Sequence, residues 1–151
     1  MNGGDWRDEI IYQVIVDRFA NGDINNDHRV VQSALGRYQG GDWQGQIDHL
    51  DYLTDLGVTA LWISPNVKNI DYDAGFDGYH GYWTQSFTKI NPHFGSPAKL
   101  RELVDKAHAR GMKIILDEST PQKLRLLIDN RHVVVTYMVP GLVGLEDVGR
   151  G

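Results

Sequence analysis

The chain has 151 residues, of which 41% are hydrophobic, 23% charged and 10% aromatic, a composition typical of a folded globular domain. Its net charge of −5 argues against nucleic acid as a partner, because that binding depends on a basic surface, and favours a neutral or cationic ligand. Cysteine is absent, which excludes disulfides, zinc-thiolate sites and a thiol nucleophile.

The first third of the chain predicts a strand, a loop and a helix. Ile10–Phe19 is apolar and β-branched almost throughout, as in a strand buried on both faces of a parallel sheet. The stretch from Asn21 to Gly41 is dense in Asn, Asp and Gly, which favours a long functional loop without regular structure. Apolar residues then recur at helical spacing from Ile47 to Leu56, and Gly57 ends this first helix.

The middle of the chain repeats this alternation. Val58–Ile63 predicts a second buried strand, and a loop rich in Tyr, Asp, Gly and His runs from Ser64 to Gly95. Ser96 is a typical N-cap, with Pro97 opening a second helix. The apolar face of this helix is formed by Leu100, Leu103, Val104 and Ala107, and the helix ends at Gly111.

Lys113–Asp117 predicts the third strand, so the order of elements is β-α-β-α-β. Right-handed crossovers then give a parallel sheet with outer helices, an α/β fold. Beyond it we expect a third helix from Thr120 to Asn130, a fourth strand at Val133–Val139 and a loose terminus from Leu142 to Gly151.

Four segments with glycine, aromatic and carboxylate residues follow one another in a fixed order. They are Ile11–Phe19 with Asn21-Gly22-Asp23, Gly40–Gly45, Leu56–Pro65 and Gly78–Trp83. Together they resemble the catalytic barrel of α-amylase-type glycoside hydrolases, including cyclodextrin glycosyltransferases, and the resemblance covers residues 10–117. A closed (β/α)8 (TIM) barrel takes about 250 residues. The resemblance therefore implies a partial barrel of three to four β/α units, with residues 1–117 as its N-terminal part and residues 118–151 as a tail that does not match the family.

A candidate metal site lies in the first loop. Asn21, Asp23, Asn26 and Asp27 carry four oxygen-bearing side chains within seven residues, and Asp42 follows the return of the loop. Such oxygen donors are the ligands that Ca²⁺ prefers, but the same residue types also form turns, and their spacing alone leaves both interpretations open. The resemblance favours calcium as a cofactor and implies that Gly40 adds a carbonyl ligand.

A candidate sugar site follows the second strand, at the end of the barrel where (β/α)8 enzymes place their active sites. It contains Tyr79, His80, Tyr82 and Trp83. The resemblance implies that Tyr82 packs against the sugar next to the cleaved bond and that His80 forms a hydrogen bond with it. The alternative is that these aromatic side chains only pack a long loop onto the barrel rim.

Asp117 ends the third strand and matches the Asp that opens the family motif Asp-x-x-x-Asn-His, which makes it a candidate substrate contact. Pro121 and Gln122 stand where that motif has Asn and His. A retaining glycosidase needs two carboxylates about 5–5.5 Å apart. The family carries them on strands four and five, whereas Val133–Val139 contains no carboxylate. Asp117 is thus a candidate catalytic residue, and the catalytic carboxylates of the family are not identified in this chain.

Two functions follow from these patterns. The first is an incomplete catalytic domain that acts on or binds α-1,4-glucans such as starch and maltooligosaccharides. The second is a non-catalytic, calcium-stabilised half-barrel that binds sugar or self-assembles. Because four apolar strands leave two sheet edges in water, we expect a homodimer. The start of the chain has no signal-peptide pattern and no apolar run approaches ~18 residues, so we expect no membrane partner and a chain that is cytoplasmic or secreted with its signal removed.

Overall fold

The structure is a computed structural model, and it describes residues 5–117, 133–139 and 142–148, with side chains up to residue 134. Its main sheet contains β1 (Ile11–Val14), β2 (Ala60–Ile63), β7 (Lys113–Asp117), β8 (Val133–Val139) and β9 (Leu142–Val148), hydrogen-bonded in that order. The first four strands are parallel and β9 is antiparallel to β8. The predicted parallel α/β sheet is therefore confirmed.

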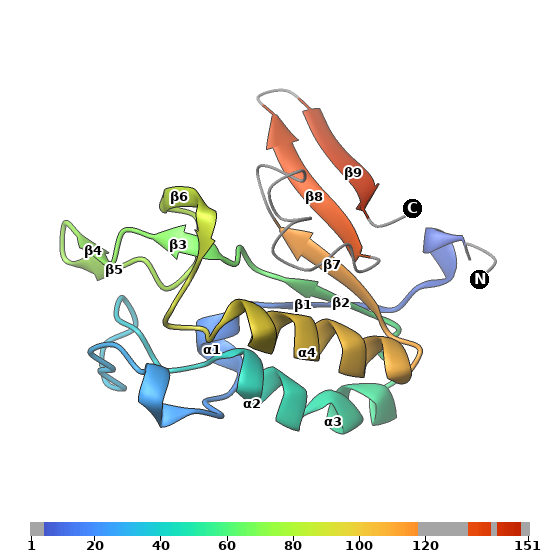
Figure 1. The fold of residues 1–151 in the computed structure, drawn as a ribbon, viewed down its shortest axis with the longest axis horizontal. Helices are drawn as coiled ribbons and strands as arrows, with labels where there is room; N and C mark the ends of the chain where they lie inside the picture. Colours follow the sequence, from blue (N-terminus) through green and yellow to red (C-terminus); the bar gives the residue numbers. More distant parts are fainter. Residues whose placement is uncertain (1–4, 118–132, 140–141, 149–151) are drawn as a thin grey trace.

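Helices cover one face of this sheet. Figure 1 shows α4 (Pro97–Ala109) beside a row formed by the consecutive helices α2 (Trp43–Asp48) and α3 (Leu50–Asp55), all on one side of β1, β2 and β7. As predicted, α4 begins at an N-cap in which Lys99 N donates to Ser96 Oγ at 3.1 Å. Its apolar face is fully buried against the inner residues of β2 and β7. This face and the sheet form the core that fixes where the loops begin and end.

The first predicted strand is wrong in length and in burial. Only Ile11–Val14 is extended, and α1 (Val16–Phe19) follows it directly. β1 pairs with β2 alone in the described sheet, so it is an edge strand, and Ile10 and Ile11 are 58% and 45% exposed. The apolar run is therefore shared between a half-covered strand and a helical turn.

The first predicted helix is in fact two short helices. Asp42 caps α2, whose first residue, Trp43, precedes the periodic leucines. His49 separates α2 from α3, and its Nδ1 lies 2.8 Å from the carbonyl oxygen of Gly45. Leu56 follows α3 and is 56% exposed, so it does not belong to the buried face that its spacing predicts.

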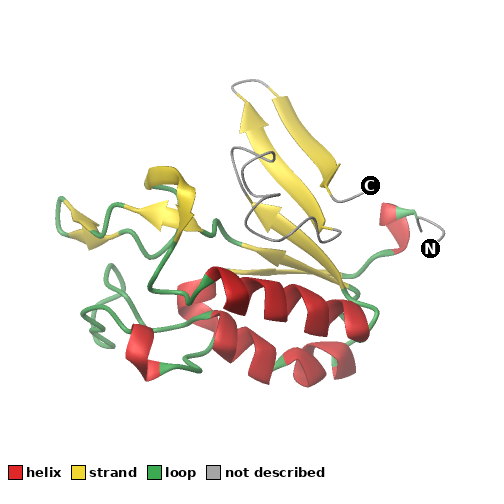
Figure 2. Cartoon of the chain, viewed as in Figure 1, coloured by secondary structure: helices red, strands yellow, loops and turns green. Residues whose placement is uncertain are grey.

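The loops differ in how much regular structure they contain. The first loop has only the short helix η2 (Ile24–Asn26), so its prediction holds apart from this turn. The second loop contains two antiparallel strand pairs that the sequence did not predict (Figure 2). These are β3 (Val67–Asn69) with β6 (Thr84–Ile90), and β4 (Tyr72–Asp73) with β5 (Phe76–Asp77). The short helix η1 (Trp6–Asp8) precedes the sheet.

The fourth predicted strand is confirmed as β8, and the pairing of its Val134 with Ile115 of β7 sets the register of the two strands. The expected loose terminus is wrong for residues 142–148, because β9 forms a full antiparallel ladder with β8 from Val133↔Val148 to Val139↔Leu142. The helix predicted from Thr120 to Asn130 lies outside the described residues, as do Pro121 and Gln122. Among the helices that the structure describes, none is long and apolar enough to cross a membrane.

Candidate functional site

Asp42 organises the first loop. Its side chain is fully buried, and each carboxylate oxygen accepts two hydrogen bonds. Gly22 N and Gly45 N donate to Oδ1 at 3.0 and 2.7 Å, and Asp23 N and Asn26 Nδ2 donate to Oδ2 at 2.9 and 3.0 Å. One carboxylate thus caps α2 and fixes the start of the loop. Its four acceptor positions are all used by this chain, so it holds the loop in shape.

Asp17 fixes the return of the same loop. It is 2% exposed, and its carboxylate accepts hydrogen bonds from Gln39 N at 3.0 Å and Gly40 N at 3.2 Å. Arg18 Nε lies 3.0 Å from Asp17 Oδ2. Burial raises the pKa of Asp17, while these donors and Arg18 act in the opposite direction. The buried carboxylate therefore joins α1 to the residues that precede α2.

Two glycines allow the backbone of the loop to approach α2. A Cβ added at Gly45 would lie 1.9 Å from the carbonyl oxygen of Ala20, and one added at Gly41 would lie 2.2 Å from the carbonyl oxygen of Val16. Both neighbours are backbone atoms, which cannot turn away as a flexible side chain can. The Gly-Gly-Asp-Trp-Gln-Gly segment is thus needed for this close packing.

The predicted calcium ligands fall into two groups. Asn21, Asp27 and Gly40 are neighbours: Asn21 Nδ2 donates to Asp27 Oδ1 at 2.8 Å, and a Cβ at Gly40 would lie 3.0 Å from Asp27 Oδ1. Asn26 bonds to Asp42, while the Asp23 carboxylate accepts from Asn25 N at 3.0 Å and caps η2.

The donor chemistry of this loop fits a hard cation. Asn26 Oδ1 is buried and has no hydrogen-bond partner among the described residues. Gly40 has φ of +92°, and the space beside it, which a Cβ would fill, borders the Asn21 amide and the Asp27 carboxylate. Rotation of the Asn21 amide would bring its oxygen to that space. Carboxylate, amide and backbone oxygens are the ligands that Ca²⁺ takes in proteins.

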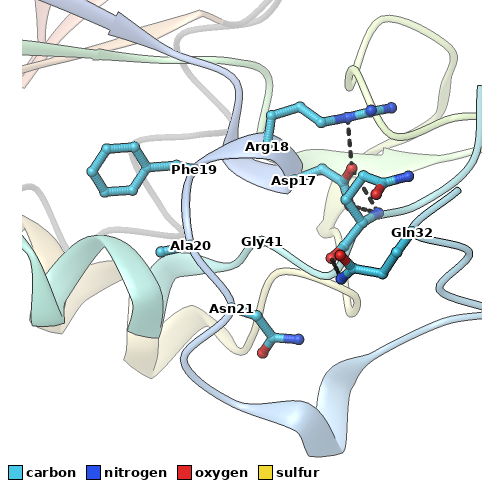
Figure 3. Close-up of a pocket in the computed structure, with 8 residues that line it drawn as sticks. Asp17, Arg18, Phe19, Ala20, Asn21, Gln32 and Gly41 are labelled. Atoms are coloured by element: carbon cyan, nitrogen blue, oxygen red, sulfur yellow. Dashed lines mark hydrogen bonds and ion pairs between the residues drawn. The ribbon is translucent and has the colours of Figure 1, made fainter. Parts of the chain in front are cut away.

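A cavity of about 380 Å³ lies beside this loop. Figure 3 shows Asp17 and Arg18 on one side of it and the side chains of Asn21 and Gln32 on the other. Gln39 also lines the cavity, but its amide Nε2 donates to backbone carbonyls, at 3.0 Å for Val31 and 2.9 Å for Ala34. The polar lining of the cavity thus comes from groups that hold the loop, and the predicted sugar residues are not among those that line it.

The structure brings the predicted sugar residues to the end of β7. Tyr82 Oη donates to Asp117 Oδ2 at 2.6 Å, which joins the second loop to the carboxyl end of the third parallel strand. Tyr82 is nevertheless 51% exposed, so part of its ring faces solvent. Desolvation and the bond to Asp117 raise the pKa of Tyr82, and the phenol stays a hydrogen-bond donor at neutral pH.

His80 lies beside Tyr82 with a defined tautomer. The two rings are stacked, with centroids 5.9 Å apart and an interplanar angle of 19°. Tyr82 N donates to His80 Nδ1 at 2.9 Å, so Nδ1 is unprotonated and the ring proton is on Nε2. Burial lowers the pKa of His80, which keeps the ring neutral at pH 7. His80 can therefore donate one hydrogen bond from Nε2 to a ligand.

Tyr79 and Trp83 support this pair and are less open to a ligand. Trp83 lies edge-on to His80 at 4.8 Å, and its backbone N donates to Asn69 Oδ1 at 2.6 Å. The Arg18 guanidinium covers the ring of Tyr79 at 3.8 Å. The arrangement can bind a flat apolar ring face on Tyr82 and a hydroxyl on His80, as sugars require.

Asp117 remains a candidate catalytic residue, and it accepts a hydrogen bond from Tyr82. Glu118, the acid that follows Asp117 in the sequence, lies outside the described residues. Glu146 and Asp147 lie on β9, at register positions opposite Val135 and Val134, and their side chains are not among those described.

Sequence reasoning missed the residues that connect the two loops. Asp77, 3% exposed at its side chain, accepts hydrogen bonds from Arg37 Nε at 2.9 Å and Tyr38 N at 2.8 Å. His28 and His93, from different loops, stack with ring centroids 4.3 Å apart. Both contacts join residues more than thirty positions apart, so no local spacing could have predicted them.

Comparisons with known proteins cover most of the chain. The family Alpha-amylase, described as alpha amylase, catalytic domain, matches residues 13–120. An uncharacterized glycosyl hydrolase of Schizosaccharomyces pombe is 48% identical over 114 residues, which are 74% of this chain and 22% of that protein. A cyclomaltodextrin glucanotransferase of Geobacillus stearothermophilus is 41% identical over 128 residues, 78% of this chain and 18% of that protein.

Solved structures agree with these matches. A gamma-CGTase from alkalophilic Bacillus clarkii superposes with a TM-score of 0.71 at 40% identity, covering 83% of this chain and 18% of that chain. An Anoxybacillus alpha-amylase also has a TM-score of 0.71, at 41% identity, and covers 86% of this chain and 25% of that chain. The chain spans about a fifth of the length of the curated relatives it matches.

Proposed function

Because this chain belongs to the alpha-amylase family and forms part of its α/β barrel fold, we propose that it is the N-terminal part of a catalytic domain that acts on or binds α-1,4-glucans. The observation that carries this proposal is the hydrogen bond of 2.6 Å between Tyr82 and Asp117. It holds an exposed aromatic ring at the carboxyl end of the parallel strands, where (β/α)8 enzymes bind their substrates.

In this proposal Tyr82 and His80 form one wall of a sugar subsite. The ring of Tyr82 stacks on the apolar face of a glucose unit, and Nε2 of His80 donates to a sugar hydroxyl. Asp117 holds Tyr82 in place and accepts a hydrogen bond from the sugar, and Trp83 orients His80. Because one wall buries only part of a sugar, we expect maltooligosaccharides to bind weakly, at millimolar concentration.

Tryptophan fluorescence tests the subsite, because Trp83 lies 4.8 Å from His80. Maltotriose should quench the emission of the unaltered chain, and Tyr82→Ala should abolish the quenching. Tyr72→Ala is the matched control, since Tyr72 is also 51% exposed but lies on β4. Equal binding by Tyr82→Ala and the unaltered chain would show that the subsite is wrongly assigned.

Catalysis is tested by release of a dye from an α-glucoside. Release above the buffer rate assigns the reaction to this chain and makes Asp117→Asn the next variant to measure. Maltooligosaccharide binding without release supports the alternative function, a non-catalytic, calcium-stabilised module.

Calcium is the proposed cofactor of the first loop. Asn21, Asp27 and the carbonyl of Gly40 would form one side of the site. Asn26 and Asp23 complete the proposed ligand set, and Asp42, whose oxygens already accept four hydrogen bonds, would hold Asn26 in position. The unpartnered Asn26 Oδ1 supports the site most directly. When bound, the ion would neutralise the carboxylates and keep the loop folded beside α2.

Thermal melting tests the calcium site. An ion that binds only the folded state stabilises it by about 2.7 kcal/mol at a hundredfold excess over Kd. EDTA should therefore lower Tm, and added Ca²⁺, but not Mg²⁺, should restore it. Asp27→Asn should remove the response, whereas Asp55→Asn, a change at an exposed acid in α3, should keep it. A melt that does not respond to Ca²⁺ would reject the site.

We also propose that the chain forms a homodimer through the edge strand β1. Ile11 in β1 and its neighbours Ile10 and Ile15 are 45%, 58% and 41% exposed. In the described sheet β1 pairs only with β2, which favours pairing of its other edge with a second copy. Light scattering coupled to size exclusion should give twice the chain mass of 17.1 kDa. A stable species of the single mass at micromolar concentration would reject the dimer.

A further inference from the structure

Three side chains from separate parts of the two loops meet beside Tyr38. They are His28 after η2, Asp71 before β4 and His93 before α4, and one ligand atom from each lies within 4.8 Å of the other two. We propose that they bind a divalent first-row transition-metal ion of the Zn²⁺ type. This site is separate from the oxygen ligands assigned to calcium.

The ligand types select the metal. Two imidazoles and one carboxylate suit Zn²⁺, Ni²⁺, Cu²⁺ or Fe²⁺, whereas Ca²⁺ takes oxygen ligands alone. His93 Nε2 lies 2.8 Å from Asp71 Oδ1, and His28 Nε2 lies 4.0 Å from Asp71 Oδ2. The same nitrogen of each ring thus faces one oxygen of a shared carboxylate.

A hydrogen bond between His93 and Asp71 explains only part of this geometry. His28 is beyond hydrogen-bond distance of Asp71, yet it stacks on His93 at 4.3 Å with an interplanar angle of 19°. Two protonated imidazoles would repel each other at this separation. A metal ion bound by one nitrogen of each ring would stabilise both histidines in this arrangement.

Tyr38 is a second, independent observation that supports a ligand beside His28 and His93. Its side chain is 2% exposed, and Oη has no hydrogen-bond partner among the described residues. The ring is edge-on to His28 at 5.6 Å and to His93 at 5.2 Å. A buried hydroxyl without a partner costs about 1–3 kcal/mol. A water bound to the metal would supply that partner.

The side chains can close around an ion. Ligand atoms in a tetrahedral zinc site are about 3.3 Å apart, given bond lengths of about 2.0–2.1 Å. The side chains of His28, Asp71 and His93 are 29%, 46% and 15% exposed, so they have room to rotate by the small amount required. Bound metal would then join the first loop, the β3–β4 connection and the turn before α4.

Isothermal titration calorimetry of the full chain with Zn²⁺ tests the proposal, after EDTA treatment and dialysis into excess Ca²⁺. The calcium occupies the oxygen ligands, so the measured heat reports the histidine site. We expect one Zn²⁺ to bind per chain, with a Kd in the micromolar range. His28→Gln, His93→Gln and Asp71→Asn should each weaken binding at least tenfold, since even outer-sphere partners of metal ligands contribute about 10–100-fold.

His108→Gln, in the last turn of α4, is the matched control and should bind as the unaltered chain does. If His93→Gln does not fold, the visible absorption spectrum of the unaltered chain with Co²⁺ decides in its place, because mixed nitrogen and oxygen coordination gives a spectrum different from that of aqueous Co²⁺. No binding, equal binding by all variants, or an aqueous Co²⁺ spectrum would each overturn the proposal.

Discussion

The two loops at the carboxyl ends of β1 and β2 differ in the burial of their candidate functional residues. Asp17 and Asp42 flank the first loop and are at most 2% exposed, and their oxygens accept hydrogen bonds from its backbone. In the second loop, Tyr72, Phe76 and Tyr82 are 51%, 56% and 51% exposed. The carboxylates that flank the first loop thus stabilise its shape, whereas the second loop, in which Asp77 is buried, also presents large aromatic side chains to solvent.

This difference agrees with the two proposed sites. A loop held by buried carboxylates keeps its ligand atoms in fixed positions, which suits an ion. A loop with exposed rings held by a few bonds, such as that from Tyr82 to Asp117, offers a surface to a larger ligand. Substitutions in the first loop should therefore change stability, and those in the second should change binding.

The largest effect is expected at Gly45. In an ordinary helix Gly→Ala stabilises, but here the new Cβ would lie 1.9 Å from a backbone oxygen of Ala20, so Gly45→Ala should cost about 3 kcal/mol. Gly36→Ala is the control, because its nearest neighbour is the exposed ring of Phe76, which can turn away. Urea unfolding of both variants measures the difference; equal costs would show that the first loop is not tightly packed.

Removal of the Asp42 carboxylate should have the next largest effect. Asp42→Ala loses the cap of α2 and leaves buried donors without an acceptor, so the free energy of unfolding should fall by about 2 kcal/mol. Ser96→Ala, which removes only the cap of α4, should cost about 1 kcal/mol. If the two variants lose the same amount, Asp42 acts as a helix cap alone.

Tyr82→Ala should scarcely change stability. The side chain is half exposed, and surface substitutions of this kind stay within about 0.5 kcal/mol. The same variant should lose maltotriose binding, which gives the contrast with Asp42→Ala. A stability loss as large as that of Asp42→Ala would mean that the second loop is structural as well.

The smallest effect is expected at Glu102, outside both loops. Hydrogen bonds from Lys106 and Lys99 lower the pKa of Glu102 below its usual 4.5. Its contribution is therefore full above pH 4.5 and is lost as the pH falls further. Because this glutamate is 36% exposed at its side chain, Glu102→Gln should cost no more than about 0.5 kcal/mol at pH 7. Unfolding at pH 7 and pH 3 should show a larger cost at pH 7 than at pH 3.

The sequence predicted the elements whose signals are local. Ser96, Pro97 and the apolar face of α4 lie within one helix, and β7 and β8 are short apolar runs. The sequence did not predict the break between α2 and α3 at His49, because it depends on where α2 begins at its cap Asp42. It did not predict the exposure of β1 either, because this depends on which strands lie beside β1. Neither is determined by spacing.

The candidate sites show the same limit. Order along the chain was enough to name Tyr82 and Asp117, but not the bond between them, which spans thirty-five positions. It named Asp42 as a metal ligand without showing that four donors of this chain already use its oxygens. The pairing of β3 with β6 was missed because shifts of register interrupt the regular alternation of inward and outward side chains along these strands.

The strand β9 ends the main sheet and runs antiparallel to the other four strands. Parallel barrels grow by adding strands that run the same way, and the outer edge of β8 is where such a strand would attach. In this chain that edge is occupied over the whole of Val133–Val139. Any further parallel strand, from this chain or another, would first have to displace β9, which follows β8 closely in the sequence. Because short loops close faster than long ones, β9 would pair with β8 again before a distant segment could bind.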